Sequence, residues 1–195
     1  MVNQEDPRVL RTRQLIRTAF RDLLQRKGFD AITIKDIAQE ATINRATFYA
    51  HFEDKYALLD EVTEQAFHER IPEQVVNAEE FTEDICDQLI IMTHQYIIDF
   101  YRICRIDSNP MAKLVDDKIK KLLQQTIESI FMKGDTCHGT DIHHIKIMAA
   151  MTGSAIYGAA HYWLNAGENN RTDVLVDIAR PYVMNGLGLA TPSTT

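Results

Sequence analysis

Apolar residues recur at spacings of three and four positions along almost the whole chain. This period is typical of helices that bury one face, and no stretch alternates apolar and polar residues as a half-buried strand does. Long helices are predicted at 8–27, 82–104, 110–133, 141–166 and 172–187. The first of them ends at Gly28, and its apolar stripe consists of Ile16, Ala19, Phe20, Leu23 and Leu24. The sequence therefore predicts an all-α protein.

Shorter helical segments follow Gly28. Thr33, with Asp36 three positions later, has the spacing of a capping box, so a short helix begins there. A second short helix begins at Asn44 and a third at about Asp54. About nine helices are expected in total.

Two short helices joined by a tight turn, behind a longer first helix, are the pattern of a helix-turn-helix domain that binds DNA. On the second of them, Phe48 and Phe52 lie about 40° apart around the helix axis, so both face the core. The opposite face carries Ala46 and Ala50, whose small side chains would let the backbone approach base edges. We therefore expect a helix-turn-helix domain over 1–53, a connecting helix over 54–71 and a larger helical domain over 72–195.

Polar residues around the second short helix suit contacts with DNA. Arg45 lies in its first turn, where a guanidinium can pair with guanine O6 and N7. Asn44, as the N-cap, leaves backbone N–H groups directed outward beside the positive end of the helix dipole, which suits a phosphate. The predicted contacts are Thr33, Lys35, Asn44, Arg45, Ala46, Thr47, Tyr49 and Lys55. Of these, Arg45, Thr47 and Tyr49 are expected to contact DNA directly, while Thr33, Lys35 and Lys55 hold its backbone.

The charge distribution favours a polyanionic partner at one end of the molecule. The net charge is −7, which argues against a protein that coats nucleic acid indiscriminately. However, residues 8–27 contain seven basic side chains and one acidic one, whereas residues 61–195 contain 11 basic and 19 acidic ones. Such asymmetry is expected where one end meets DNA, although a solvated helix face would explain the basic segment equally well.

The segment ITIKDIAQEATINRATFYAHFEDKYALL (32–59) resembles the N-terminal domain of the TetR family of bacterial transcriptional regulators. The matching positions are Thr33, Ile37, Ala38, Thr47, Phe48, Tyr49, Phe52, Lys55 and Leu58. The similarity covers roughly residues 8–60. Two positions depart from the family pattern, since Thr42 and Ala46 stand where the family often has glycine. Thr42 would be strained at positive φ, so either the turn differs locally or strain is tolerated.

The resemblance implies a homodimer that binds double-stranded operator DNA with two recognition helices about one turn apart. It also implies repression that a small-molecule effector, of unknown identity, relieves by binding in the C-terminal domain. Aromatic, methionine and histidine side chains that could line such a pocket are Met92, His94, Tyr96, Phe100, Phe131, Tyr157 and His161, although most of them could equally be core.

The family dimerises through its last two helices, which here correspond to 141–166 and 172–187. Ala150, Ser154 and Gly158 follow one another at intervals of four, so they form a stripe of small residues on the first of these helices. This stripe is the candidate dimer interface. Tight packing within one subunit is the alternative explanation.

Other classes of function find little support in the sequence. We expect no cofactor and no enzyme activity, because no phosphate loop or nucleophile motif is present. The run DTCHGTDIHH (135–144) is expected to be a solvated loop without a metal, and the uncharged segment 147–167 a helix buried on most sides rather than a membrane span. Three irregularly spaced cysteines and an N-terminus without an apolar stretch predict a cytoplasmic protein. A co-regulator that binds a protein instead of DNA, and an all-α enzyme or ligand carrier, remain alternatives.

Overall fold

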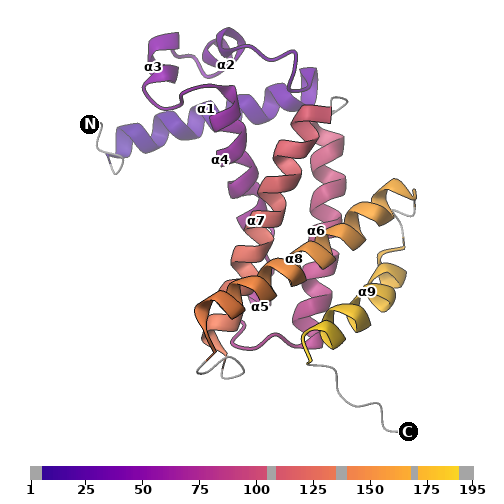
Figure 1. Cartoon of the computed structure of the whole chain (residues 1–195). Helices are drawn as coiled ribbons and strands as arrows, with labels where there is room; N and C mark the ends of the chain where they lie inside the picture. Colours follow the sequence, from indigo (N-terminus) through magenta and orange to yellow (C-terminus); the bar gives the residue numbers. More distant parts are fainter. Residues whose placement is uncertain (1–5, 105–108, 135–139, 168–170, 189–195) are drawn as a thin grey trace, which may run out of the picture. The chain divides into compact units, whose positions relative to one another are not determined.

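The computed structural model in Figure 1 describes residues 6–104, 109–134, 140–167 and 171–188. Within these ranges the chain forms nine helices and no strand, which confirms the predicted all-α class. No helix in the described ranges is long and apolar enough to cross a membrane.

Four helices make up the N-terminal region: α1 (Pro7–Lys27), α2 (Ile34–Glu40), α3 (Arg45–Tyr49) and α4 (Lys55–His68). The five residues of the predicted stripe on α1 are all buried. Gly28 ends α1 at φ 71° and donates its N–H to the Leu24 carbonyl, as its position in the sequence predicted. α2 packs against both α1 and α3, so α1 supports the short helices (Figure 1).

Five helices follow: α5 (Glu73–Val76), α6 (Glu83–Cys104), α7 (Asn109–Lys133), α8 (Ile142–Asn165) and α9 (Thr172–Gly186). The four long ones begin and end within a few residues of the predicted positions. α5 was not predicted, because a four-residue helix directly after Pro72 is too short to show an apolar period.

The chain divides into two compact units. One comprises Met1–Ala66 and Phe100–Val115, and the other comprises Phe67–Asp99 and Asp116–Thr195. The first unit contains α1 to α3 and most of α4, whereas α5, α8 and α9 lie in the second. The expected DNA-binding domain over 1–53, connecting helix over 54–71 and effector-binding and dimerisation domain over 72–195 stay a prediction.

The expectation that α8 is buried on most sides is wrong for the single chain. Its inner face is buried, with Ile145, Ala149, Ile156 and Ala160 among the residues of lowest exposure. The other face carries large apolar side chains in solvent, namely Ile147, Met151 and Tyr162. An absence of charge can therefore mark an uncovered apolar face as well as a buried helix.

Candidate nucleic-acid interface

The turn between α2 and α3 contains the residue with unusual backbone geometry. Thr42 has φ 56°, the only positive φ among the described residues other than glycine. Its N–H donates to the Gln39 carbonyl at 3.2 Å, and the next N–H, from Ile43, donates to the Ala38 carbonyl at 2.9 Å. Of the two possibilities left open by the sequence, the turn thus keeps the left-handed conformation and tolerates a β-branched residue there.

Asn44 fixes the start of α3. Its Oδ1 accepts the Thr47 N–H at 2.7 Å and the Thr47 hydroxyl at 3.0 Å, which confirms the predicted N-cap. The side chains of Phe48 and Phe52 are buried, with ring centroids 5.8 Å apart, which confirms that both belong to the core.

The outer face of α3 is exposed to solvent. Arg45, Ala46 and Ala50 are exposed, and Thr47 is half-buried because its hydroxyl contacts Asn44. Tyr49 is 57% exposed, and its ring makes a T-shaped contact with the Phe48 ring at 5.7 Å between centroids. This face can therefore offer a guanidinium, a phenol hydroxyl and closely approachable backbone to a groove.

The N-terminus of α2 is fixed by a reciprocal capping box. Thr33 donates its N–H and its hydroxyl to Asp36 Oδ2 at 2.9 and 2.7 Å, and its hydroxyl accepts the Asp36 N–H at 3.2 Å. These hydrogen bonds, with Lys27 at 3.0 Å, hold the pKa of the Asp36 carboxyl well below its usual range. The Thr33 hydroxyl is thus engaged locally, whereas Lys35 extends from the same helix into solvent.

Lys55, the first residue of α4, is engaged within the fold. Its Nζ donates to three carbonyl oxygens, those of Phe29 at 3.1 Å, Asp30 at 3.4 Å and Ile32 at 3.0 Å. The ammonium also lies 4.4 Å from the centroid of the Phe29 ring. An ammonium has three N–H donors, so these carbonyls can occupy all of them. The sequence predicted that Lys55 contacts the DNA backbone. It did not reveal that the Lys55 ammonium binds the carbonyls of residues 29–32.

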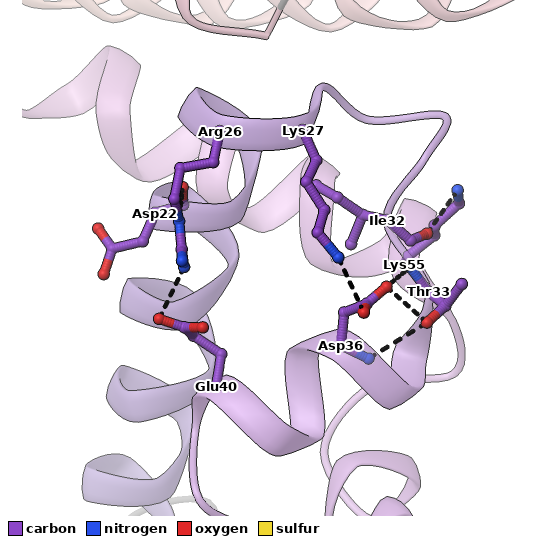
Figure 2. Close-up of polar contacts among 8 residues, drawn as sticks. All are labelled: Asp22, Arg26, Lys27, Ile32, Thr33, Asp36, Glu40 and Lys55. Atoms are coloured by element: carbon purple, nitrogen blue, oxygen red, sulfur yellow. Dashed lines mark hydrogen bonds and ion pairs between the residues drawn. The ribbon is translucent and has the colours of Figure 1, made fainter.

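Several basic residues of α1 pair with carboxylates of the same unit. Arg26 lies 2.7 Å from Glu40, and Lys27 lies 3.0 Å from Asp36. Both pairs join α1 to α2 (Figure 2). Arg13 and Arg17 both pair with Glu61 of α4. Much of the positive charge predicted to attract DNA is therefore paired with carboxylates of the same unit, and Arg8 and Arg11 are exposed arginines at the N-terminal end of α1.

The candidate effector residues are mostly core. Met92, His94, Tyr96, Phe100, Phe131 and Tyr157 are buried, and His161 is half-buried. Cavities of about 480, 710 and 200 Å³ among the described residues of the second unit are lined by other side chains. A pocket formed by the predicted residues therefore stays a prediction.

Two of the predicted effector residues have polar contacts inside the second unit. Tyr157 donates its hydroxyl to Asp116 and stacks on His161 with centroids 5.7 Å apart. His94 Nδ1 lies 3.1 Å from the Thr172 hydroxyl, and burial lowers the pKa of its imidazole.

The candidate dimer stripe lies on the uncovered face of α8. Ala150 is half-buried, and Ser154 and Gly158 are exposed. A Cβ at Gly158 would meet nothing within 4 Å, so packing within the subunit does not require glycine there. By contrast, a Cβ at Gly153 would lie only 3.3 Å from the Gln124 backbone nitrogen of α7, so the close contact between the two helices favours glycine there. The apolar period of the sequence did not single out Gly153.

The predicted solvated loop lies partly outside the described residues, since Asp135, Cys137 and His138 fall in 135–139. His143 and His144 are exposed on α8. Among the residues that the structure describes, no three His, Cys, Asp or Glu side chains are grouped so that they could hold a metal ion. Asp141 directly precedes α8, but its side chain makes no capping hydrogen bond.

The geometry of α2, the turn and α3 defines a helix-turn-helix protein, with one aromatic face buried and the other face open. Residues 16–62 match the model of a family described as bacterial regulatory proteins, tetR family. Residues 16–62 thus carry the N-terminal domain of the TetR family, as the sequence motifs indicated.

Two relatives in sequence are also regulators. The chain is 28% identical over 181 residues to the HTH-type transcriptional regulator YxbF of Bacillus subtilis (strain 168), covering 88% of this chain and 44% of that protein. It is 40% identical over 60 residues to the dhaKLM operon transcriptional activator DhaS of Lactococcus lactis subsp. lactis (strain IL1403), covering 31% and 32%. The chain thus spans less than half of the length of these relatives.

Solved structures share the fold over nearly the whole chain. The dihydroxyacetone kinase operon activator DhaS superposes with a TM-score of 0.57 at 20% identity, covering 92% of this chain and 98% of that one. The fatty acid degradation regulator FadR from Bacillus halodurans superposes with a TM-score of 0.59 at 16% sequence identity. The match covers 95% of this chain and 98% of that one. A TetR from Acinetobacter baumannii AYE in complex with minocycline superposes with a TM-score of 0.57 at 16% sequence identity. The match covers 90% of this chain and 95% of that one.

Proposed function

We propose that this protein is a DNA-binding transcriptional regulator that reads an operator with the outer face of α3. The observation that carries the proposal is the division of this helix into two faces. Phe48 is buried, while Arg45, Ala46 and Tyr49 are open to solvent. A helix held from behind by an aromatic core, with small and hydrogen-bonding residues in front, suits the major groove.

Individual residues take different parts in this proposal. Arg45 reads a base pair from the first turn of α3, and Tyr49 donates its hydroxyl to a phosphate or base. Lys35, which is exposed on α2, contacts the DNA backbone. Thr33, Asn44 and Thr47 act mainly through the caps that fix α2 and α3. Lys55 acts indirectly, because its ammonium is engaged by the carbonyls of 29–32.

A homodimer is part of the proposal, since half-sites of a pseudo-palindromic operator are read by two-fold-related subunits. The exposed apolar side chains of α8 continue onto α9, where Ile178 and Tyr182 are 52% and 79% exposed. A hollow of about 200 Å³ lies between these helices and is lined by Met148, Met151, Thr152, Ala155, Tyr182 and Val183, with Gly186 and Leu187. A second copy of the chain packs on this surface.

The regulator responds to a small molecule bound in its C-terminal domain. The support is the fold shared with proteins that carry a ligand in their structures, such as the TetR complexed with minocycline. We take the action to be repression that the effector relieves, by a shift between two packings of the helical domain. DhaS is named an activator, so a reporter assay with and without the protein must determine the sign.

The experiment that tests DNA binding is selection of bound duplexes from a random library, followed by titration of the selected sequence. Arg45→Ala should weaken binding by about 1–3 kcal/mol and relax specificity at one position. Arg171→Ala, which removes an exposed arginine of the second unit, serves as the control and should leave binding unchanged. A stable dimer that enriches no sequence, even at low salt, would refute the proposal and favour a co-regulator that binds protein.

A further inference from the structure

Arg13 of α1 contacts three groups of its unit at once. Its Nη1 donates to the His51 carbonyl at 3.1 Å, and its Nη2 pairs with the Glu61 carboxylate of α4. The guanidinium also lies over the Phe52 ring, 4.5 Å from the centroid. Two of these three groups belong to the segment that directly follows α3.

α3 needs such support because it has only five residues, Arg45–Tyr49. A helix of that length has no stability of its own in water, so its orientation depends on what holds its two ends. Asn44 holds the first end. At the other end, Arg13 holds the two residues that follow the C-cap Ala50, through the His51 carbonyl and the Phe52 ring.

Glu61 fixes Arg13 in this position. One oxygen of its carboxylate faces Arg13, and the other accepts from Arg17 Nη1 at 3.1 Å. The three side chains are only 21–28% exposed, so solvent screens them less than it screens ion pairs at the open surface. With both of its terminal nitrogens donating and one face of its guanidinium on the Phe52 ring, Arg13 has little left to offer a phosphate.

We propose that Arg13 is a positioning residue for the recognition helix, which it holds through the His51 carbonyl and the Phe52 ring while Glu61 holds it in turn. This inference rests on the proposed function of α3 in reading DNA. A lysine cannot replace Arg13, because a single ammonium cannot stack on a ring while donating in two fixed directions as a planar fork does. The role differs from that of a basic residue which attracts DNA by its charge.

Arg17 provides a matched control. It pairs with the same carboxylate from the same helix, and its second nitrogen donates to Gln14 at 2.8 Å, on α1 itself. Arg17→Ala therefore removes a charge of the same sign and an ion pair to Glu61 without removing a contact to the end of α3. Any difference between Arg13→Ala and Arg17→Ala reports on the contacts to His51 and Phe52.

The test measures binding of the full chain to the sequence that the wild type selects from a random duplex library, over a range of salt concentrations. Arg13→Ala and Arg13→Lys should each weaken this binding about tenfold or more, as loss of a hydrogen bond to a charged group implies. The slope of log Kd against log salt and the affinity for random DNA should stay unchanged. Arg17→Ala should keep the selected-sequence affinity within about threefold.

A charge swap separates positioning from stability. Arg13→Glu combined with Glu61→Arg restores an ion pair between α1 and α4, so its melting temperature should recover relative to Arg13→Glu alone. Its affinity for the selected sequence should stay low, because a carboxylate at position 13 cannot donate to the His51 carbonyl.

Three results would overturn the inference. If Arg13→Ala lowers the salt slope by about one and weakens all sequences equally, Arg13 is a phosphate ligand. If the Arg13 and Arg17 variants lose affinity together, in proportion to melting temperature, the network only stabilises the fold. If Arg13→Lys binds as the wild type does, the fork is not needed. A wild type that selects no sequence would instead refute the proposed function itself.

Discussion

The ammonium of Lys55 lies 3.0 Å from the carbonyl oxygen of Ile32, so the first residue of α4 is bound to the segment that leads into α2 (Figure 2). The same ammonium contacts the carbonyls of Phe29 and Asp30. Lys55, which the sequence predicts to contact the DNA backbone, therefore also joins two parts of one unit. This contact distinguishes it from Lys35, which is exposed on α2 beside the proposed DNA-reading surface.

Lys55→Met should destabilise the fold. The change keeps most of the aliphatic stem but leaves three carbonyls without their shared donor, so the free energy of unfolding should fall by about 1–3 kcal/mol. Urea unfolding followed by circular dichroism measures this. Lys35→Met is the control, since Lys35 is exposed on α2. It should leave stability within about 0.5 kcal/mol while lowering the salt slope of DNA binding by about one. The reverse pattern would show that Lys55 contacts DNA.

Thr42→Gly should stabilise the protein. Thr42 has φ 56°, where a side chain with a Cβ is disfavoured by about 1–2 kcal/mol, while glycine adds some entropy to the unfolded chain. The net gain should be about 0.5–1 kcal/mol in the free energy of unfolding. Thr42→Ala retains a Cβ and should bring a smaller gain. Equal stability of wild type and Thr42→Gly in urea titrations would mean that the turn carries no strain.

Local features of this unit could be predicted from the sequence because they depend on near neighbours. The caps at Thr33 and Asn44 join residues three positions apart. The burial of Phe48 and Phe52 follows from helical spacing alone, once the second short helix is placed. The left-handed conformation of Thr42 was one of two stated possibilities, since the turn between α2 and α3 is short.

Long-range partners could not be predicted in this way. Arg13 and Glu61 are 48 positions apart, and Lys55 reaches carbonyls 23 to 26 positions away. Their charges were visible in the sequence, but the direction of each side chain depends on how α1, α2 and α4 pack. For the same reason the basic composition of 8–27 indicated attraction to DNA, whereas several of these side chains form ion pairs within the unit.

The Asp36 carboxyl should make the stability of the N-terminal region depend on pH in the acidic range. Hydrogen bonds from Thr33 and the charge of Lys27 lower the pKa of its carboxyl in the folded state. The unfolded chain therefore binds a proton more readily than the folded one. This contribution is present in full above the unfolded pKa of about 3.8 and is lost as the pH falls toward the folded pKa.

Asp36→Asn removes this dependence on acid. Unfolding free energies measured from pH 6 down to about pH 3 should fall less steeply for Asp36→Asn than for the wild type, with the two curves converging at low pH. Near neutral pH the variant should be the less stable protein, since an amide is a weaker acceptor than a carboxylate for the Thr33 donors. Parallel curves over this range would mean that the Asp36 carboxyl has the same pKa in the folded and unfolded chains.

Met151→Asp should turn the proposed dimer into a monomer. Met151 is 68% exposed on α8 and lines the hollow between α8 and α9, together with Tyr182 of α9. A carboxylate enclosed there by a second copy would lose its hydration without gaining a partner, which costs several kcal/mol and outweighs the apolar contact. Sedimentation velocity on wild type and variant measures the change in mass.

Met132→Asp tests whether position on the molecule matters. Met132 is 50% exposed on α7, and the side chains near it line a different hollow with Lys121, Lys133 and Lys146. A carboxylate there stays hydrated and lies near ammonium groups, so the dimer should persist.

Because two half-sites are read together in the proposed dimer, Met151→Asp should also weaken binding to the full operator far more than binding to an isolated half-site. A Met151→Asp protein that remains dimeric would place the contact between subunits on another face.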